Sequence, residues 1–285
     1  MPSAYYLTLS CENRRGIVAA VASQLFQAGG NILEAQQFDD VISSRFFMRV
    51  SFDFEHAIDE AALREQLNPI ASQYAMQWSL RLQSEEQRVL ILVSKYVHCL
   101  VDLLYRQRIG ELPMTVVGVV SNHPKETLNS SLLGDIPFHH LPVTPATKKQ
   151  QEQSILAIVE ETQAELIVLA RYMQILSNDM AACLSGRCIN IHHSFLPGFK
   201  GAKPYTQAFE RGVKMIGATA HYVTGDLDEG PIIEQRTEAI RHSDLPDALE
   251  RKGRDIERQV LARAVLNHLE NRVLINGTKT VVFGE

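Results

Sequence analysis

Three short, nearly uninterrupted apolar runs constrain the fold of this chain more than any other feature. They lie at Val89–Val93, Thr115–Val120 and Leu166–Leu169. A strand that is apolar on both faces is buried on both sides, as in a parallel sheet covered by helices. Helical patterns at about Tyr96–Arg108 and Thr147–Glu161 separate the runs. This alternation predicts a doubly wound, Rossmann-like α/β sheet that binds its ligand at the carboxyl ends of the strands.

The first 84 residues carry a different pattern, in which apolar and polar residues alternate along the strands. Such strands are expected at Tyr5–Leu9, Ile32–Phe38, Phe46–Phe54 and Met76–Leu82. Two amphipathic helices lie between them, and Gly29-Gly30 ends the first because glycine readily adopts the positive φ of a helix C-cap. The order β-α-β-β-α-β predicts a ferredoxin-like α/β domain. The polar segment Gln83–Gln87 places the domain boundary, which gives domains 1–84 and 85–285.

One stretch, Arg187–Gln235, contains most of the polar residues that a reaction would use. Its first part, Cys188–His192, predicts a buried strand, and the alternation of side chains projects Asn190 and His192 from the same face. Neighbouring histidines on a strand point to opposite faces, so we do not expect His192 and His193 to chelate one ion. No His-Glu-x-x-His motif or paired cysteine spacing occurs, and we expect no metal.

A second strand in this stretch, Gly217–Thr224, carries His221 and ends in a loop that contains Asp226 and Asp228. An amide donor, an imidazole and a carboxylate at strand ends are the groups needed to add a nucleophile to a carbonyl. The amide stabilises the oxyanion, and the other two groups move protons. The structural alternative is that each is a hydrogen-bonded packing residue, which is the commoner role of a lone buried asparagine or histidine.

These residues resemble the signature of the folate-dependent formyltransferase superfamily. The matching positions are Asn190-Ile191-His192, Ser194, Leu196-Pro197, His221, Leu227-Asp228 and Gly230-Pro231. The resemblance implies that Asn190 binds the formyl oxygen and that His192 stabilises the developing charge. It also implies that Asp228 organises an attacking water, with His221 in support.

The same resemblance implies a binding loop for the pterin ring of folate at Leu169–Leu176. Within it, Met173, Gln174, Ile175 and Leu176 are the expected folate-binding residues, although the apolar ones could instead belong to the core. Lys200 and Lys203 are candidates for holding the glutamate tail, or are solvated surface residues. Folate is the substrate in this reading, and no cofactor is expected.

Two observations favour water over an amine as the formyl acceptor. His193 stands where the transferases of the superfamily usually carry proline. The first strand–helix turn has no glycine from Arg88 to Ile109, whereas phosphate-binding relatives of this architecture use a glycine-rich turn there. We therefore expect hydrolysis of 10-formyltetrahydrofolate to formate and tetrahydrofolate, which supplies formate for purine synthesis and balances the one-carbon pool. Formyl transfer to an amine is the alternative, and a folate-binding sensor without turnover is a third.

In the first domain, Asn13–Val18 and Gly30–Ile32 resemble the ACT domain, a regulatory module that commonly binds amino acids. The resemblance implies effector contacts from Asn13, Gly16 and Asn31, often where two such domains pair in a homo-oligomer. Glycine or methionine is the expected effector. A dimerisation module without a ligand is the alternative.

Composition narrows the class of protein further. The chain has 285 residues and a formal net charge of −5, which offers no general affinity for nucleic acid. Its four scattered cysteines suggest reduced thiols rather than a disulfide framework. No signal-peptide pattern and no apolar run near the ~20 residues of a membrane span occur. These features predict a cytoplasmic protein without membrane contacts.

Overall fold

The computed structural model describes residues 3–128, 133–196 and 204–284. Its chain divides into two compact units. The first unit comprises Met1–Glu86, Glu270–Asn276 and Val281–Glu285, and the second comprises Gln87–Leu269 and Gly277–Thr280. The expectation that residues 85–285 form one domain therefore differs from the structure at the C-terminus, where Glu270–Asn276 and Val281–Glu285 belong to the first unit.

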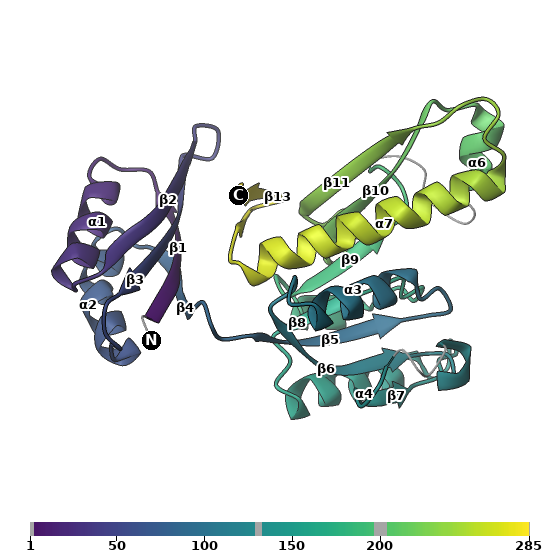
Figure 1. Ribbon diagram of the computed structural model, residues 1–285, viewed down its shortest axis with the longest axis horizontal. Helices are drawn as coiled ribbons and strands as arrows, with labels where there is room; N and C mark the ends of the chain where they lie inside the picture. The colour runs from purple at the N-terminus through teal and green to yellow at the C-terminus, as the bar shows by residue number, and fades with distance from the viewer. Residues whose placement is uncertain (1–2, 129–132, 197–203, 285) are drawn as a thin grey trace. The chain divides into compact units, whose positions relative to one another are not determined.

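The first unit has the predicted βαββαβ order. Its elements are β1 (Ser3–Glu12), α1 (Ile17–Gln27), β2 (Asn31–Asp40), β3 (Arg45–Phe54), α2 (Glu60–Gln73) and β4 (Gln77–Leu82). The strands form an antiparallel sheet in the order β2-β3-β1-β4, and both helices cover one face of it (Figure 1). Gly29 follows α1 with a φ of 82°, the left-handed conformation expected of a glycine that ends a helix.

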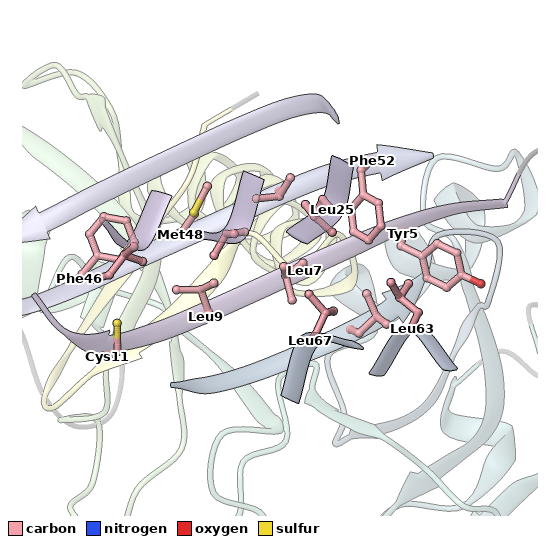
Figure 2. Close-up of a cluster of buried hydrophobic side chains, with 14 of the residues drawn as sticks. Tyr5, Leu7, Leu9, Cys11, Leu25, Phe46, Met48, Phe52, Leu63 and Leu67 are labelled. Carbon is pink, nitrogen blue, oxygen red and sulfur yellow. The ribbon is translucent and has the colours of Figure 1, made fainter. Parts of the chain in front are cut away.

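The core of this unit lies between the sheet and its two helices (Figure 2). Every second residue of β1, from Tyr5 to Cys11, is buried there, together with Met48 and Phe52 of β3. Leu25 of α1 and Leu63 of α2 meet them from the helices. The period-two alternation read from the sequence thus fixes which face of the sheet is covered.

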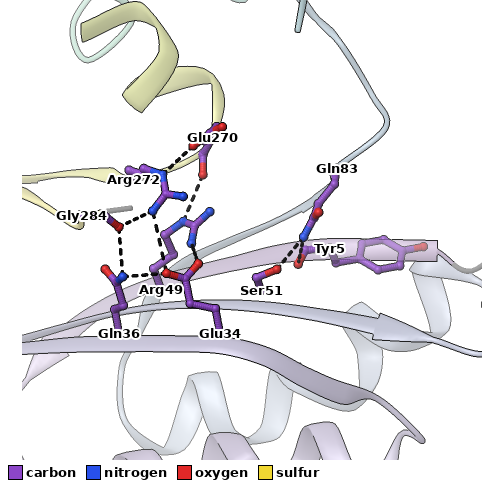
Figure 3. Close-up of polar contacts among 9 residues, drawn as sticks. All are labelled: Tyr5, Glu34, Gln36, Arg49, Ser51, Gln83, Glu270, Arg272 and Gly284. Carbon is purple, nitrogen blue, oxygen red and sulfur yellow. Dashed lines mark hydrogen bonds and ion pairs between the residues drawn. The ribbon is translucent and has the colours of Figure 1, made fainter. Parts of the chain in front are cut away.

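The other face of β3 is also buried, which the alternating pattern did not predict. Arg49 lies on this face with a side chain only 1% exposed. Its Nη1 donates to Glu34 Oε2 at 2.7 Å, and its Nε donates to the carbonyl of Glu270 at 3.1 Å (Figure 3). Its guanidinium also lies over the ring of Tyr6, 4.4 Å from the centroid. Arg272 reaches the carbonyl of Gly284 beside them. Residues from the C-terminal segment therefore complete the first unit.

The second unit is the predicted α/β sheet. Its strands are β5 (Gln87–Val93), β6 (Met114–Ser121), β7 (Phe138–His140), β8 (Leu166–Leu169), β9 (Cys188–His192), β10 (Met215–Tyr222) and β11 (Ile232–Ala239). Its helices are α3 (His98–Arg108), α4 (Lys148–Glu161), α5 (Asn178–Cys183), α6 (Pro204–Arg211) and α7 (Pro246–Leu269), with a 3-10 turn at Lys125–Leu128.

The strand order is β11-β10-β9-β8-β5-β6-β7. The strands from β9 to β7 are parallel, whereas β10 and β11 add an antiparallel edge that the alternation of strands and helices did not reveal. Leu90 and Leu92 of β5 pack in one core with Ile155 of α4. The long helix α7 packs over β9, β10 and β11 and beside α3 (Figure 1).

The chain ends in a hairpin of β12 (Val273–Asn276) and β13 (Lys279–Val282). Gly277 sits in its turn with a φ of 62°, as the Asn276-Gly277 pair predicts. None of the described helices combines the length and apolar character needed to cross a bilayer.

Replacement of Arg49 tests the stabilising role of the contacts on this second face. Arg49→Met removes the buried cation and leaves Glu34, which is one-third exposed, with only Gln36 and the more distant Arg272 as partners among the described contacts. We expect a loss of about 2 kcal/mol in the free energy of unfolding. The single tryptophan of the chain, Trp78, lies on β4 and reports urea unfolding of this unit by fluorescence. Arg14→Met, in the exposed pair with Glu12, should leave the free energy of unfolding close to that of the wild type. Equal losses in the two variants would contradict this account.

Candidate active site

The pairing of β9 with β10 brings the first three candidate residues together. In the antiparallel register His221 lies opposite Asn190, and Thr219 lies opposite His192. Residues directly opposite each other share a face, and so do residues two apart on one strand. Asn190, His192, Thr219 and His221 therefore project from the same side of the sheet, as the sequence predicted.

Asp228 reaches this group from the loop between β10 and β11. Its Oδ2 lies 3.2 Å from His192 Nδ1, and its Oδ1 lies 3.6 Å from His221 Nε2. Asn190 Nδ2 lies 3.3 Å from His221 Nε2. The side chains of His192 and Asp228 are largely buried, at 8% and 13% exposed. All four predicted residues thus meet at one point, whereas Asp226 on the same loop is exposed and has no ion pair among the described contacts.

The hydrogen bonds of His221 fix the position of its ring proton. Its Nδ1 lies 2.9 Å from the carbonyl oxygen of Tyr222, which can only accept, so Nδ1 carries the hydrogen. With one proton on the ring, Nε2 accepts from the amide of Asn190. A second proton would be shared with Asp228.

Two backbone features hold Asp228 in place. Its own φ is 57°, a left-handed conformation that aspartate tolerates better than most residues. Gly230 follows, where the chain passes close to the carbonyl of Tyr222. A Cβ added to Gly230 would lie 1.7 Å from that oxygen and 3.2 Å from His221 Nδ1. Only glycine lets the loop close over β10.

The carboxylate of Asp228 is ionised in this setting. Burial on its own raises the pKa of Asp228, but hydrogen bonds and charge interactions with His192 and His221 outweigh burial and hold the pKa well below its usual range. An ionised Asp228 accepts the Nδ1 hydrogen of His192. The Nε2 of His192 is then the atom left for chemistry, and it is buried without a hydrogen-bond partner in the described structure.

The structure corrects the expected orientation of His193. Strand β9 ends at His192, so His193 no longer follows the alternation, and the two ring centroids lie only 5.0 Å apart. Burial, together with the neighbouring Arg171 and His192, lowers the pKa of His193 to about 4. His193 is therefore a neutral imidazole beside His192 and the ionised Asp228.

Thr219 anchors the loop that follows β9. Its side chain is fully buried, and its Oγ1 donates to the carbonyl of Ser194 at 2.9 Å. The same oxygen accepts from the backbone N–H of Leu196 at 3.1 Å and from Gln235 Nε2 at 2.9 Å. This anchor sets the direction in which the chain leaves the site. Lys200 and Lys203, expected further along this loop, lie outside the described residues.

The predicted folate loop begins beside the site, since Leu169 of β8 pairs with Asn190 of β9. Met173 and Ile175 are 52% and 59% exposed, which is unusual for large apolar side chains. Leu176 instead packs against the core of the second unit. The backbone N–H of Met173 donates to Ser94 Oγ at 3.0 Å and so is not available to a ligand. Gln174 is half-buried between the two exposed residues.

A second buried polar cluster adjoins the site, and sequence reasoning did not identify it. Glu257 of α7 is 1% exposed and accepts from Tyr205 Oη at 2.6 Å. Its other oxygen lies 2.8 Å from His98 Nε2 and 3.4 Å from Arg171 Nε. An acidic residue on the apolar stripe of α7 was the available signal, because that stripe otherwise faces the core.

Part of this cluster has the donor types of a metal site. One atom each from His98, Cys99 and Glu257 lie within 4.8 Å of one another. Burial raises the pKa of the Cys99 thiol well above its usual value, so the sulfur keeps its proton. The guanidinium of Arg171 lies against the same carboxylate. This donor set is ill suited to a cation.

The three candidate effector residues are not gathered within one chain. Asn31 pairs with Asp53 at one end of β3, whereas Asn13 follows Glu12, which pairs with Arg45 at the other end. Strand geometry separates these ends by about 25 Å. Gly16, which precedes α1 with a φ of 93°, lies on the Asn13 side. A single copy of this unit does not form the site that the ACT resemblance implies.

Two other features lie away from the site. His139 and His140 are on β7, the edge strand on the far side of β5 and β6 from β9. A depression of about 650 Å³ is lined by Ala164, Glu165 and Arg187, which precede β8 and β9, at the edge of the sheet opposite the candidate site. Ligands of doubly wound sheets bind at the carboxyl edge, so this depression is not the expected pocket.

The assembled groups can carry out base-assisted addition to a carbonyl. An ionised carboxylate orients an imidazole whose other nitrogen is open to accept a proton, and an amide donor stands next to it. This arrangement has the parts of a hydrolytic site: a base, a residue that orients the base, and a donor for an oxyanion.

The chain is similar to known formyl transferases and formyltetrahydrofolate deformylases. The sequence profile of the formyl transferase family matches residues 87–265. The formyltetrahydrofolate deformylase of Corynebacterium sp. (strain P-1) is 49% identical over 279 residues, which cover 98% of this chain and 97% of that protein. The crystal structure of the formyltetrahydrofolate deformylase from Burkholderia mallei ATCC 23344 is 52% identical and has a TM-score of 0.93, covering 99% of this chain and 100% of its own. Glycinamide ribonucleotide transformylase 1 from Symbiobacterium toebii is 28% identical with a TM-score of 0.66, covering 72% of this chain and 98% of its own.

The close approach at Gly230 can be tested by adding a methyl group. Gly230→Ala must displace the loop or the carbonyl of Tyr222, and we expect a loss of about 2–4 kcal/mol in stability. Gly225→Ala, in the same loop, is the matched control, because its Cβ would meet Asn178 Oδ1 at an ordinary 3.4 Å. Thermal unfolding compares the two variants. A Gly230→Ala protein as stable as Gly225→Ala would show that the approach is not needed.

Proposed function

The chain belongs to the formyl transferase family, and we propose that it hydrolyses 10-formyltetrahydrofolate to formate and tetrahydrofolate. The observation that carries this proposal is the ionised Asp228 hydrogen-bonded to His192, beside the Asn190 amide. The chain that carries this site also matches formyltetrahydrofolate deformylases along nearly their whole length. The match to a transformylase covers a smaller part of the chain.

The proposed reaction begins with the activation of water. Asp228 accepts the Nδ1 hydrogen of His192 and orients the ring, so Nε2 takes a proton from the water. The hydroxide attacks the formyl carbon, and the electron pair of the C=O bond moves to oxygen. Asn190 has two N–H groups, of which one points to His221, and the other stabilises the oxyanion.

Collapse of the tetrahedral intermediate completes the hydrolysis. The oxyanion re-forms its C=O bond, and the C–N bond breaks with its electrons going to the folate nitrogen. His192 returns its proton to that nitrogen, so that water has supplied OH to carbon and H to nitrogen. The low pKa of Asp228 keeps it ionised throughout, so the imidazolium of His192 has a partner while it exists.

The substrate is proposed to place its pterin against Met173 and Ile175. Both side chains are exposed beside Asn190 and offer a flat apolar surface, which is what an aromatic ring system needs. Gln174 lies between them to contact the polar edge of the ring. Leu176 supports the loop from the core.

The proposal requires no metal or cofactor, because side chains supply the base and the oxyanion donor. The products fit a role in supplying formate for purine synthesis and balancing the one-carbon pool. Cytoplasmic location is part of the proposal, and the four free cysteines support it.

Replacement of the oxyanion donor gives the direct test. Purified enzyme with 10-formyltetrahydrofolate alone should release formate without any amine acceptor. Asn190→Ala should lower kcat by about 10²–10³-fold while its thermal unfolding stays close to that of the wild type. A strict requirement for an amine would favour the transferase alternative, and binding without turnover would favour the sensor. An unfolded Asn190→Ala protein would make Asn190 structural.

We further propose that the first unit binds an amino acid where two copies of the chain pair. The loop containing Asn13 and the strand end containing Asn31 lie too far apart in one copy. An antiparallel pair would bring Asn13 of one copy toward Asn31 of the other. Glycine or methionine is the proposed effector, since one-carbon metabolism connects both to folate.

Regulation can be read from the same formate assay. Saturating glycine or methionine should change the rate several-fold, as expected for a coupling of about 1–3 kcal/mol. Asn31→Ala should abolish this response, whereas Gln73→Ala, at an exposed position on α2, should retain it. Rates unaffected by either amino acid would leave the unit as a dimerisation module.

A further inference from the structure

The cluster around Glu257 has no part in the hydrolysis described above. Its carboxylate is buried, accepts from Tyr205 and His98, and pairs with Arg171. Burying a carboxylate is unfavourable unless partners surround it, and such a cluster is often less stabilising than apolar packing would be. Its presence here therefore indicates a role other than stability.

The members of the cluster gather at the ligand-binding edge of the sheet. His98 follows β5, and Arg171 follows β8, at the carboxyl ends of these parallel strands. Tyr205 stacks edge-on against His193, with ring centroids 6.5 Å apart, and His193 adjoins the catalytic His192. The cluster therefore borders the reacting centre, in the region where folds of this class receive their substrates.

Arg171 occupies a backbone position that normally suits glycine. Its φ is 63°, in the left-handed region that is strained for most side chains. The Arg171 side chain is 90% buried. Its guanidinium lies over the ring of Tyr96, 5.6 Å from the centroid, and against Glu257. An outlier of this kind beside an active site points to a function of the side chain itself.

Tyr205 is fitted into the cluster with similar specificity. A Cβ added to Gly253, one turn before Glu257 on α7, would lie 2.0 Å from Tyr205 Oη. The absence of a side chain at Gly253 lets the phenol reach the carboxylate. Arg171 thus has a backbone conformation that favours glycine, and Gly253 lies inside a helix, where glycine is unfavourable. Both unusual positions contribute to the same cluster.

The filled space is the region that a second substrate would need. Related folds that bind phosphate-bearing substrates leave the first strand–helix turn open with glycines, whereas here that turn contributes Tyr96 and His98. We propose that Arg171, held between Tyr96 and Glu257, fills the acceptor side of the site and thereby restricts the formyl group to water. This inference rests on the proposed hydrolysis and concerns only the choice of acceptor.

The excluded reaction is the attack of a primary amine on the same formyl carbon. The amine nitrogen would form a bond to that carbon, the bond from carbon to the folate nitrogen would break, and one amine proton would pass to the folate nitrogen. The products are a formamide and tetrahydrofolate. Asp228 and His192 suffice for this proton transfer. In this proposal, the amine is excluded because it has no space next to the formyl carbon.

Arg171→Gly tests access with little disturbance, because glycine relieves the strained backbone and leaves Tyr205 and His98 on Glu257. The double variant Arg171→Gly/Tyr96→Ala opens the region further. Gln163→Gly is the matched control, because Gln163 also has a positive φ, of 52°, but lies at the end of α4. Each protein is incubated with 10-formyltetrahydrofolate and glycinamide ribonucleotide as the probe, and both the formylated amine and the formate are measured.

We expect the wild type and Gln163→Gly to form formate with a negligible share of formylated amine. In Arg171→Gly, the ratio of formylated amine to formate should rise at least about 10-fold, and it should rise further in the double variant. If both opened variants hydrolyse the substrate with the wild-type ratio, or lose both reactions, the proposal is overturned. Failure of the wild type to release formate without the amine would instead overturn the proposed hydrolysis, so the two failures are distinguishable.

Discussion

The hydrogen bond between Asp228 and His192 is the interaction on which the rest of the site depends. It fixes one nitrogen of the imidazole as a donor and leaves the other to exchange protons. The pair forms only because the register of β9 and β10 presents His192 at the sheet edge, and because the loop closes over Gly230. The catalytic geometry is thus a consequence of strand pairing and of one missing side chain.

The site contains two buried carboxylates with opposite roles. Asp228 is paired with a histidine whose second nitrogen remains open, so its charge can assist a reaction. Glu257 is surrounded by three donors, so its charge holds neighbouring side chains in place. The difference lies in the partners rather than in the acid, since both groups have a pKa below the usual value despite burial. Conversion of a transferase architecture to hydrolysis would then depend on such a filling cluster as much as on the catalytic residues.

The parts of this structure that follow local rules were predictable from the sequence. Strand alternation placed Asn190 and His192 on one face, and continuous apolar runs located β5, β6 and β8. Features that depend on segments meeting in space were not predictable. Arg171 and Glu257 are far apart in the chain, and no local sequence pattern predicts their contact. The antiparallel edge strand β11 was missed because its composition is polar. His193 was misplaced because it lies just past the end of β9, where the alternation of side chains no longer applies.

The return of the C-terminal segment to the first unit has a consequence for how this protein can be recombined. The first unit is not formed by one contiguous segment, because Arg49 and Glu34 of its sheet contact Glu270 and Arg272 from the other end of the chain. A fusion that grafts only the leading residues onto another enzyme would carry Arg49 without its hydrogen bond to Glu270. A fusion that preserves the first unit must include both its N-terminal and its C-terminal segments. Recombination that replaces only one end of the gene would therefore disrupt this unit.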